Sequence, residues 1–212
     1  ALFRASVHGK LRIMFPMITG VDQLLAAKKM VDEVKDDLRR RNVAFDESVP
    51  IGAMVEVPAA VMIADHLAGH CDFLSVGTND LIQYCLAADR TNVRTAHLYQ
   101  PIHVAVLRML KHTLDAADAA EVPCSICGEM AGDASLTELL LGLGFRTLSM
   151  SSASLPAVRA EIANTHIPTA KRLAQKIMGL ETTDQIRDQI RQRYEQRDTL
   201  GRLRSGQASE AT

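Results

Sequence analysis

The sequence predicts an α/β fold with a parallel sheet, and more specifically the later part of a (β/α)8 barrel. Five stretches typical of buried strands each precede a stretch typical of a helix, and this alternation indicates parallel strands joined by helical crossovers. The sequence contains neither G-x-G-x-x-G nor G-x-x-x-x-G-K-[ST], the phosphate-binding motifs of nucleotide-binding sheets. Polar side chains end several of the strands, as is usual in barrels.

Two architectures compete for this pattern. A doubly wound sheet of five strands would be complete as it stands, whereas a barrel would need about three more strand–helix units upstream. The chain also begins inside a helix-like segment, ALFRASVHG, which is typical of a piece of a longer polypeptide. We therefore favour the barrel, with its first part outside this sequence.

The expected strands are short runs rich in Ile, Val, Leu, Phe and Met, bounded by turn residues. They are 11–17, 51–56, 72–77, 122–127 and 146–151. The helices between them show apolar residues at helical spacing or a favourable first residue, such as Pro58. They are 20–41, 58–69, 80–89, 103–120, 134–144 and 154–165. In the first of these helices, one apolar stripe is expected from Leu24, Leu25, Met30, Val31, Val34 and Leu38.

The composition changes near the end of the last unit. Residues 1–165 are expected to form the partial barrel, and residues 166–200 to form polar helices that are an outer layer or a subunit contact. Residues 201–212 are expected to be a disordered tail, because they contain few apolar side chains.

The overall composition is that of an ordinary globular protein. The 212 residues are 47% hydrophobic and carry a formal net charge of −1, so no general basic field would attract nucleic acid. Apolar runs are shorter than the ~20 residues that span a bilayer, and no signal peptide is visible. Four cysteines in a chain of this length do not suggest a disulfide framework, so we expect a cytoplasmic protein.

Two carboxylates are expected at the same edge of the sheet. Glu56 ends one strand, and Asp80 follows the next strand, directly after Asn79. A carboxylate at the end of a buried strand is costly unless it is paired or binds a cation. Two hard oxygen ligands suit Mg²⁺, which completes its coordination with water and substrate. The simpler alternative is that these residues only cap helices.

Arg90 and Cys127 are two further candidates at this edge. Arg90 is either a solvated surface residue or a planar clamp for phosphate or carboxylate. Cys124 and Cys127 form a C-x-x-C pair, but no second pair or nearby His completes a zinc site. Alternation along the strand places the two thiols on opposite faces, and Cys127, the last residue, is directed at the site. A thiol is mostly protonated at neutral pH, so Cys127 can act as an acid.

Four separated strings, MVEVPAA, SVGTNDLIQYCLAADR, HLYQP and ICGEMAGD, together resemble one family closely. They are similar to the phosphoenolpyruvate-binding C-terminal domain of Enzyme I, the phosphoenolpyruvate–protein phosphotransferase of the bacterial sugar phosphotransferase system. The resemblance extends from the first residues to about Thr165. AADR and HLYQP favour Enzyme I over pyruvate phosphate dikinase and phosphoenolpyruvate synthase, which remain the alternatives, together with an incomplete, non-catalytic segment.

The resemblance implies a dimeric (β/α)8 barrel and a set of roles. Glu56 and Asp80 would hold Mg²⁺, while Asn79, Asp80 and Arg90 would contact phosphoenolpyruvate. Cys127 would donate a proton. Further substrate-binding arginines, and the histidine that passes the phosphoryl group to the histidine-containing phosphocarrier protein, would lie upstream, so we expect this chain alone to be inactive in the full reaction.

Overall fold

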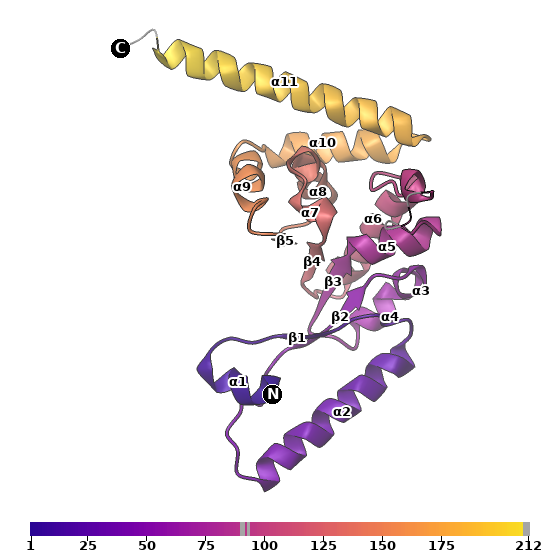
Figure 1. Ribbon diagram of the computed structural model, residues 1–212, viewed down its shortest axis with the longest axis vertical. Coiled ribbons are helices and arrows are strands. Elements are labelled where there is room, and N and C mark those ends of the chain that lie inside the picture. The colour runs from indigo at the N-terminus through magenta and orange to yellow at the C-terminus, as the bar shows by residue number, and fades with distance from the viewer. Residues whose placement is uncertain (90–91, 93, 210–212) are drawn as a thin grey trace.

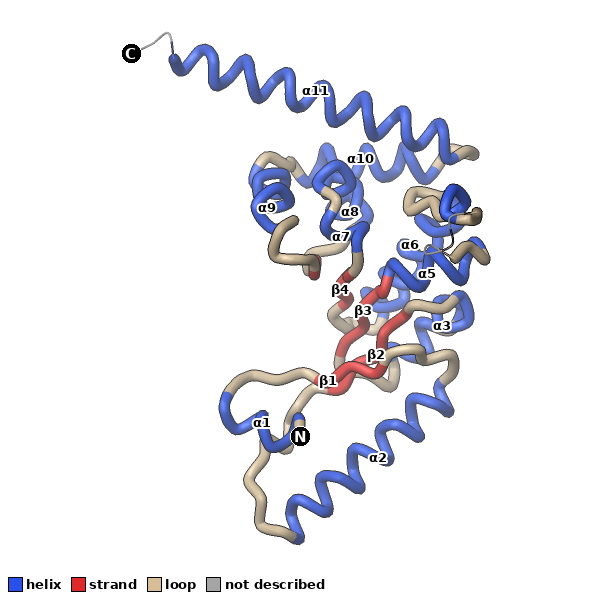
Figure 2. The backbone as a smooth tube through the Cα atoms, viewed as in Figure 1, coloured by secondary structure: helices blue, strands red, loops and turns tan. Residues whose placement is uncertain are grey.

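The computed structural model describes residues 1–89, 92 and 94–209, with side chains placed as far as Gln196. The described residues contain one sheet of five parallel strands in the order β1-β2-β3-β4-β5 (Figures 1 and 2). The strands are β1 Ile13–Phe15, β2 Ile51–Val55, β3 Phe73–Gly77, β4 Cys124–Cys127 and β5 Leu148–Ser149. The α/β fold and its five strand–helix units are therefore confirmed.

The strand order distinguishes the two predicted architectures. A doubly wound sheet reverses direction at a switch point, so that strands adjacent in the sheet are not all consecutive in the chain. Here each strand pairs with the next one along the chain, as in a barrel. Right-handed crossovers in this order place their helices on one side of the sheet. The described sheet is open, with β1 and β5 at its edges.

The two faces of the sheet differ in chemistry. Ala53, Val55, Leu74, Val76 and Ile126 point to the helices and are fully buried in the main hydrophobic cluster. The alternate positions form the opposite face, which carries mostly polar or small side chains. Its residues include Met14, Gly52, Met54, Ser75, Gly77, Ser125, Cys127 and Ser149. Side chains alternate along each strand, so every second residue lies on this face. Because the strands are parallel, their carboxyl ends lie at one edge of the sheet, and the residues of this face that end each strand lie close together there.

The helices follow the predicted order, with several breaks. They are α1 Leu2–Ala5, α2 Val21–Arg40, α3 Pro58–Met62, α4 Ala64–Ala68, α5 Thr78–Leu86, α6 Val104–Ala119, α7 Glu129–Gly132, α8 Thr137–Leu143, α9 Leu155–Ala163, α10 Ile167–Met178 and α11 Thr183–Ser209. The predicted helix 58–69 is divided between α3 and α4. In α2, Leu24, Val31 and Leu38 are buried, but Leu25, Met30 and Val34 are exposed, so the predicted apolar stripe is narrower than expected.

The C-terminal helices pack on the rest of the molecule. Ala174, Ile177, Ile186 and Ile190 belong to the same hydrophobic cluster as the strands. On α11, Arg193 forms a two-pronged ion pair with the buried Glu138 of α8, with nitrogen–oxygen distances of 3.0 and 2.9 Å. Figure 1 shows α11 at the end of the molecule opposite α2.

The backbone of α11 continues through Ser209. Residues 201–209 are therefore helical, where the composition led us to expect a disordered tail. Residues 201–209 contain two Arg, one Leu, one Gln and one Ala, which are good helix formers, together with two Gly and two Ser, which are poorer ones. Composition low in apolar residues thus did not prevent a continuous helix here.

Candidate functional site

The structure brings four of the predicted residues to the carboxyl ends of neighbouring strands. Glu56 directly follows β2, Asn79 and Asp80 lie in the first turn of α5 after β3, and Cys127 is the last residue of β4. Gly77 and Cys127 are register partners in the sheet, so these strand ends lie side by side. Arg90, the fifth predicted residue, lies outside the described residues.

Glu56 is a buried carboxylate, with only 3% of its surface exposed. Its Oε1 accepts a hydrogen bond from the backbone N–H of Met17 at 2.7 Å. Burial raises the pKa of Glu56; the Met17 N–H opposes this shift, and the charge and hydrogen bonding of Asp80 add to it. Glu56 does not cap α3, because the residue at the cap position is Val57 and no side chain bonds there.

A glycine allows the close approach of Glu56 to the neighbouring strand. A Cβ atom on Gly77 would lie 2.7 Å from Glu56 Oε2 and 2.8 Å from the sulfur of Met54. Any larger residue at position 77 would therefore displace the carboxylate from the edge of β3. Gly77 was not identified from the sequence as part of the site.

Asn79 connects the ends of β3 and β4. Its side-chain Oδ1 accepts a hydrogen bond from the N–H of Glu129, in the first turn of α7, at 3.0 Å. The neighbouring Thr78 donates its hydroxyl hydrogen to the carbonyl of Cys127 at 2.7 Å. Asn79 does not cap its own helix, because Gly77 occupies the cap position of α5 and no side chain bonds there. Its amide oxygen instead accepts from the first N–H of α7, fifty residues further along the chain. This contact leaves the Asn79 side-chain NH₂ to donate elsewhere.

Gly128 makes this connection possible. Its backbone has φ 107° and ψ −173°, a conformation that is essentially restricted to glycine. A Cβ at this position would collide with Thr78 Oγ1 and lie 2.8 Å from Asn79 Oδ1. The tight turn after Cys127 thus holds Asn79 and Cys127 together.

The thiol of Cys127 is held in its protonated form. It donates to the Val76 carbonyl at 3.4 Å and accepts from the Ser75 hydroxyl at 3.8 Å. Burial raises the pKa of Cys127; the Ser75 bond lowers it, and the charges of Glu56 and Asp80 raise it again.

Cys124 is on the other face of β4, as predicted. It packs against the hydrophobic cluster on the helix side of the sheet. Burial and the charge of Asp118 raise the pKa of Cys124 to about 12. The two cysteines are therefore separated by the sheet and face different surroundings.

A cavity of about 550 Å³ lies beside Cys127 and Asn79. Its remaining walls come from the turn after β4 and the segment after β5, and they are Gly128, Glu129, Gly132, Asp133, Ser149, Met150, Ser151 and Ser154. Its volume lies in the range of about 300–1,000 Å³ typical of small-molecule sites. A ligand there would meet hydroxyl, amide and carboxyl groups from three successive strand ends.

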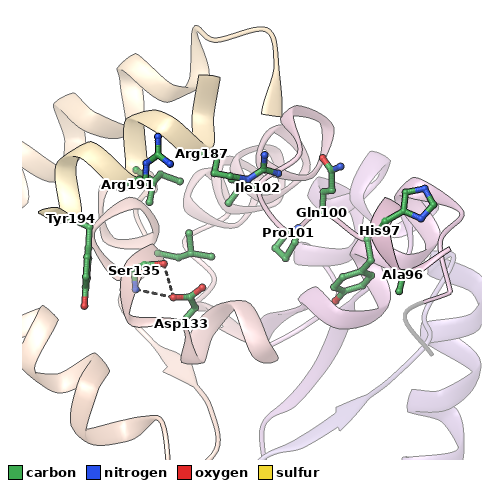
Figure 3. Close-up of a pocket in the computed structure, with 13 residues that line it drawn as sticks. Ala96, His97, Gln100, Pro101, Ile102, Asp133, Ser135, Arg187, Arg191 and Tyr194 are labelled. Atoms are coloured by element: carbon green, nitrogen blue, oxygen red, sulfur yellow. Dashed lines mark hydrogen bonds between the residues drawn. The ribbon is translucent and has the colours of Figure 1, made fainter. Parts of the chain in front are cut away.

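A second cavity, of about 560 Å³, lies beneath α11 (Figure 3). It is lined largely by apolar groups, including Ile102, Leu136 and Ile190, with Arg187 and Arg191 on its α11 wall. Asp133 borders both cavities. We place the candidate site at the first cavity, because side chains of several strand ends meet there, as they do in barrel enzymes. Asn79 and Cys127 line this cavity, whereas Glu56 and Asp80 belong to the adjoining strand ends and are not among its lining residues.

Glu56 and Asp80 fit a small, hard cation. The charge of Asp80 disfavours the ionised form of the buried Glu56 and helps to raise its pKa, and a cation between the two carboxylates would offset this effect. Oxygen ligands from one or two carboxylates are typical of Mg²⁺ sites that are completed by substrate. Within the described residues, no group of three His, Cys, Asp or Glu side chains could hold a metal ion.

Sequence reasoning missed several contributors besides Gly77. Met17 acts on Glu56 through its backbone N–H, and Tyr99 donates its hydroxyl hydrogen to the carbonyl of Asn79 at 3.3 Å. The HLYQP string includes Tyr99 and was a usable signal, whereas a backbone contact has no signature in residue type. Among the described residues, no helix is both long and apolar enough to cross a membrane.

Comparisons with known proteins show which family the chain resembles. The family described as "PEP-utilising enzyme, PEP-binding domain" matches residues 1–167. The phosphoenolpyruvate-protein phosphotransferase of Geobacillus stearothermophilus is 45% identical over 186 residues, which are 88% of this chain and 32% of that protein. The protein of the same name from Enterococcus faecalis is 48% identical over 160 residues, 76% of this chain and 28% of that protein.

The chain thus spans about a third of the length of these relatives. Among solved structures, a citrate lyase from Burkholderia xenovorans superposes with a TM-score of 0.53 at 20% identity, over 98% of this chain and 67% of that chain. This likeness concerns the fold alone. With the family match covering most of the residues, including every strand and the four converging side chains, the chain belongs to the PEP-utilising enzymes and carries their PEP-binding domain.

Proposed function

We propose that this chain is the C-terminal part of a phosphoenolpyruvate–protein phosphotransferase, the Enzyme I of a sugar phosphotransferase system. In this proposal it binds phosphoenolpyruvate and supports transfer of the phosphoryl group to a histidine on another domain. That domain then passes the group to the histidine-containing phosphocarrier protein. A cytoplasmic homodimer is part of the same proposal. The names of the curated relatives favour this function over a dikinase or a synthase.

The observation that carries the proposal is the meeting of Glu56, Asn79, Asp80 and Cys127 at one edge of the sheet. Phosphoryl transfer requires mainly correct positioning and neutralisation of charge, not covalent chemistry by the protein. We propose that Glu56 and Asp80 hold Mg²⁺, which would supply a Lewis acid for the phosphate and enolate oxygens. The Asn79 side-chain NH₂ and Arg90 would bind the phosphate.

Cys127 is the proposed proton donor to carbon. When the bond between phosphorus and the enol oxygen breaks, the phosphoryl group goes to a histidine nitrogen and the enolate of pyruvate remains. The S–H of Cys127 turns from the Val76 carbonyl to C3 of the enolate and forms the methyl group of pyruvate. The resulting thiolate regains a proton from solvent. The raised pKa of Cys127 supports this role, because the proton is present at neutral pH.

The test compares two single-cysteine variants in the full-length enzyme. Cys127→Ala should lower pyruvate formation about 10²–10⁴-fold, the usual range for general acid catalysis, and should leave phosphoenolpyruvate binding intact. Cys124→Ala is the matched control, because its thiol lies on the opposite face of the same strand and should be dispensable.

Both variants are measured at saturating phosphoenolpyruvate and Mg²⁺. Wild-type turnover by Cys127→Ala, or loss of turnover in Cys124→Ala alone, would contradict the assignment of the acid. Glu56→Gln, measured in parallel, should abolish the dependence of phosphoenolpyruvate binding on Mg²⁺.

A further inference from the structure

Met17 has a backbone conformation that is unusual for its residue type. Its φ is 55°, in the left-handed region, where a side chain with a Cβ is disfavoured by roughly 1–2 kcal/mol. The side chain is 40% exposed, so burying it does not account for the conformation. Strained backbone of this kind persists only where the surrounding structure holds it, and it is frequent at functional sites.

The turn that contains Met17 is held on both sides. Pro16 precedes it directly after β1, and Ile18, the next residue, is 2% exposed in the main hydrophobic cluster. Beyond Ile18, both the N–H and the hydroxyl of Thr19 donate to Gln23 Oε1, at 2.8 and 3.1 Å. The chain is therefore fixed before and after position 17.

This conformation directs the Met17 N–H at Glu56. The hydrogen bond to Oε1 is 2.7 Å long and joins the loop after β1 to the residue after β2. The other oxygen, Oε2, lies against Gly77 at the end of β3, the strand that leads to Asp80. The two oxygens of Glu56 thus have different neighbours, one on each side of β2.

We infer that Met17 is a positioning residue: its left-handed backbone fixes Glu56 so that Oε2 faces Asp80 and the two carboxylates can share a cation. This inference rests on the proposed function, because it assumes that Glu56 binds Mg²⁺. Hydrogen-bonding partners of metal ligands typically change metal affinity about 10–100-fold when they are lost. An effect of that size is expected if the Met17 N–H turns away from Glu56.

Three substitutions at position 17 separate the backbone from the side chain. Glycine adopts the left-handed region freely and asparagine tolerates it, so Met17→Gly and Met17→Asn should keep the N–H in place. Valine is branched at Cβ, and a positive φ is a genuine outlier for it, so Met17→Val should lose the contact. Met30→Val is the matched control, because Met30 is 66% exposed on α2.

The first measurement uses the 212-residue chain and needs no activity. The amide proton of residue 17 is observed by NMR in the wild type and in Glu56→Gln, with thermal unfolding as the check that each variant is folded. A bond to a carboxylate should shift this proton downfield, and Glu56→Gln and Met17→Val should both reduce the shift. Met17→Gly should retain it. If neither Glu56→Gln nor Met17→Val changed the chemical shift of this amide proton, the inference would be overturned, regardless of whether the proposed function is correct.

The second measurement is the Mg²⁺ concentration that half-saturates phosphoenolpyruvate turnover in the full-length enzyme. Met17→Val should raise it at least about tenfold, while Met17→Gly, Met17→Asn and Met30→Val stay within about twofold of the wild type. Equal losses in Met17→Gly and Met17→Val would overturn the inference, because the side chain would then be responsible.

The two proposals can fail separately. If Glu56→Gln removes the Mg²⁺ dependence but Met17→Val does not change it, the positioning role is wrong and the metal site stands. If Glu56→Gln leaves the Mg²⁺ dependence unchanged, Glu56 is not a metal ligand, and the positioning role proposed for Met17 is then also wrong.

Discussion

Gly128→Ala should destabilise the fold and move Asn79 away from Cys127 in the candidate site. The φ of 107° and ψ of −173° cost an alanine about 1–3 kcal/mol. The added Cβ would also push away Thr78 and Asn79, which would break the Thr78–Cys127 and Glu129–Asn79 hydrogen bonds. Each bond contributes about 0.5–1.5 kcal/mol. We therefore expect a loss of about 2–6 kcal/mol in the free energy of unfolding.

The assay is urea unfolding of the 212-residue chain, followed by far-ultraviolet circular dichroism. For a chain of this length, each kcal/mol also corresponds to a change of about 2–4 °C in Tm, so the smallest expected effect is about 4 °C. Gly69→Ala is the control, because Gly69 has an ordinary φ of −65° and its nearest neighbour atom would lie 3.5 Å from the new Cβ.

Gly69→Ala should leave stability unchanged or raise it by about 0.4–1 kcal/mol, since alanine restricts the unfolded chain. The reasoning about Gly128 would be refuted if its alanine variant were as stable as this control. Such a result would mean that the turn after β4 relaxes without disturbing Asn79.

Two further predictions concern packing and pH. Gly142 lies inside α8, where replacing glycine by alanine would normally raise the free energy of unfolding by about 1 kcal/mol. Here, however, the Cβ of the alanine would lie 2.6 Å from the carbonyl carbon of Ala170 and 3.0 Å from Ala174 Cβ. Gly142→Ala should therefore lower stability by about 1–3 kcal/mol, and a variant that unfolds at higher urea than the wild type would contradict the close packing of α8 on α10. For Cys124, the pKa is raised from 9.0 to about 12, so between these values the unfolded thiol ionises while the folded one keeps its proton. Stability should fall above pH 9 by up to about 1.4 kcal/mol per pH unit from this group, and the decline should be shallower in Cys124→Ala; equal slopes would argue that Cys124 is not responsible.

The main features of the fold and site could be predicted because they depend on side-chain pattern. Alternation of strand and helix fixed the parallel sheet, and the rule that parallel strands end at one edge placed Glu56, Asp80 and Cys127 together. The spacing of Cys124 and Cys127 in the strand correctly predicted that their side chains lie on opposite faces of the sheet. The roles proposed for these residues remain predictions.

Other features depend on backbone geometry or on neighbours distant in sequence. A methionine gives no sign that its φ will be positive, so the contact between Met17 and Glu56 could not be read from residue type. The apolar stripe predicted for α2 is wider than the face that is buried, because periodicity does not reveal how much of an apolar face neighbouring elements cover. Leu25, Met30 and Val34 lie on the uncovered part.

The order of the strands also has a consequence for how the chain can fold during synthesis. In the described sheet, each strand joins the edge left by the strand before it, and none must be inserted between two earlier strands. Within the described sheet, contacts between successive strand–helix units are therefore close in sequence. As a ribosome extends the chain, β2 with Glu56 can pair before β3 and Asn79 are synthesised. Both can be in position before β4, which ends in Cys127, is synthesised. Nascent chains stopped after residue 120 should therefore already protect β1 to β3 from proteolysis.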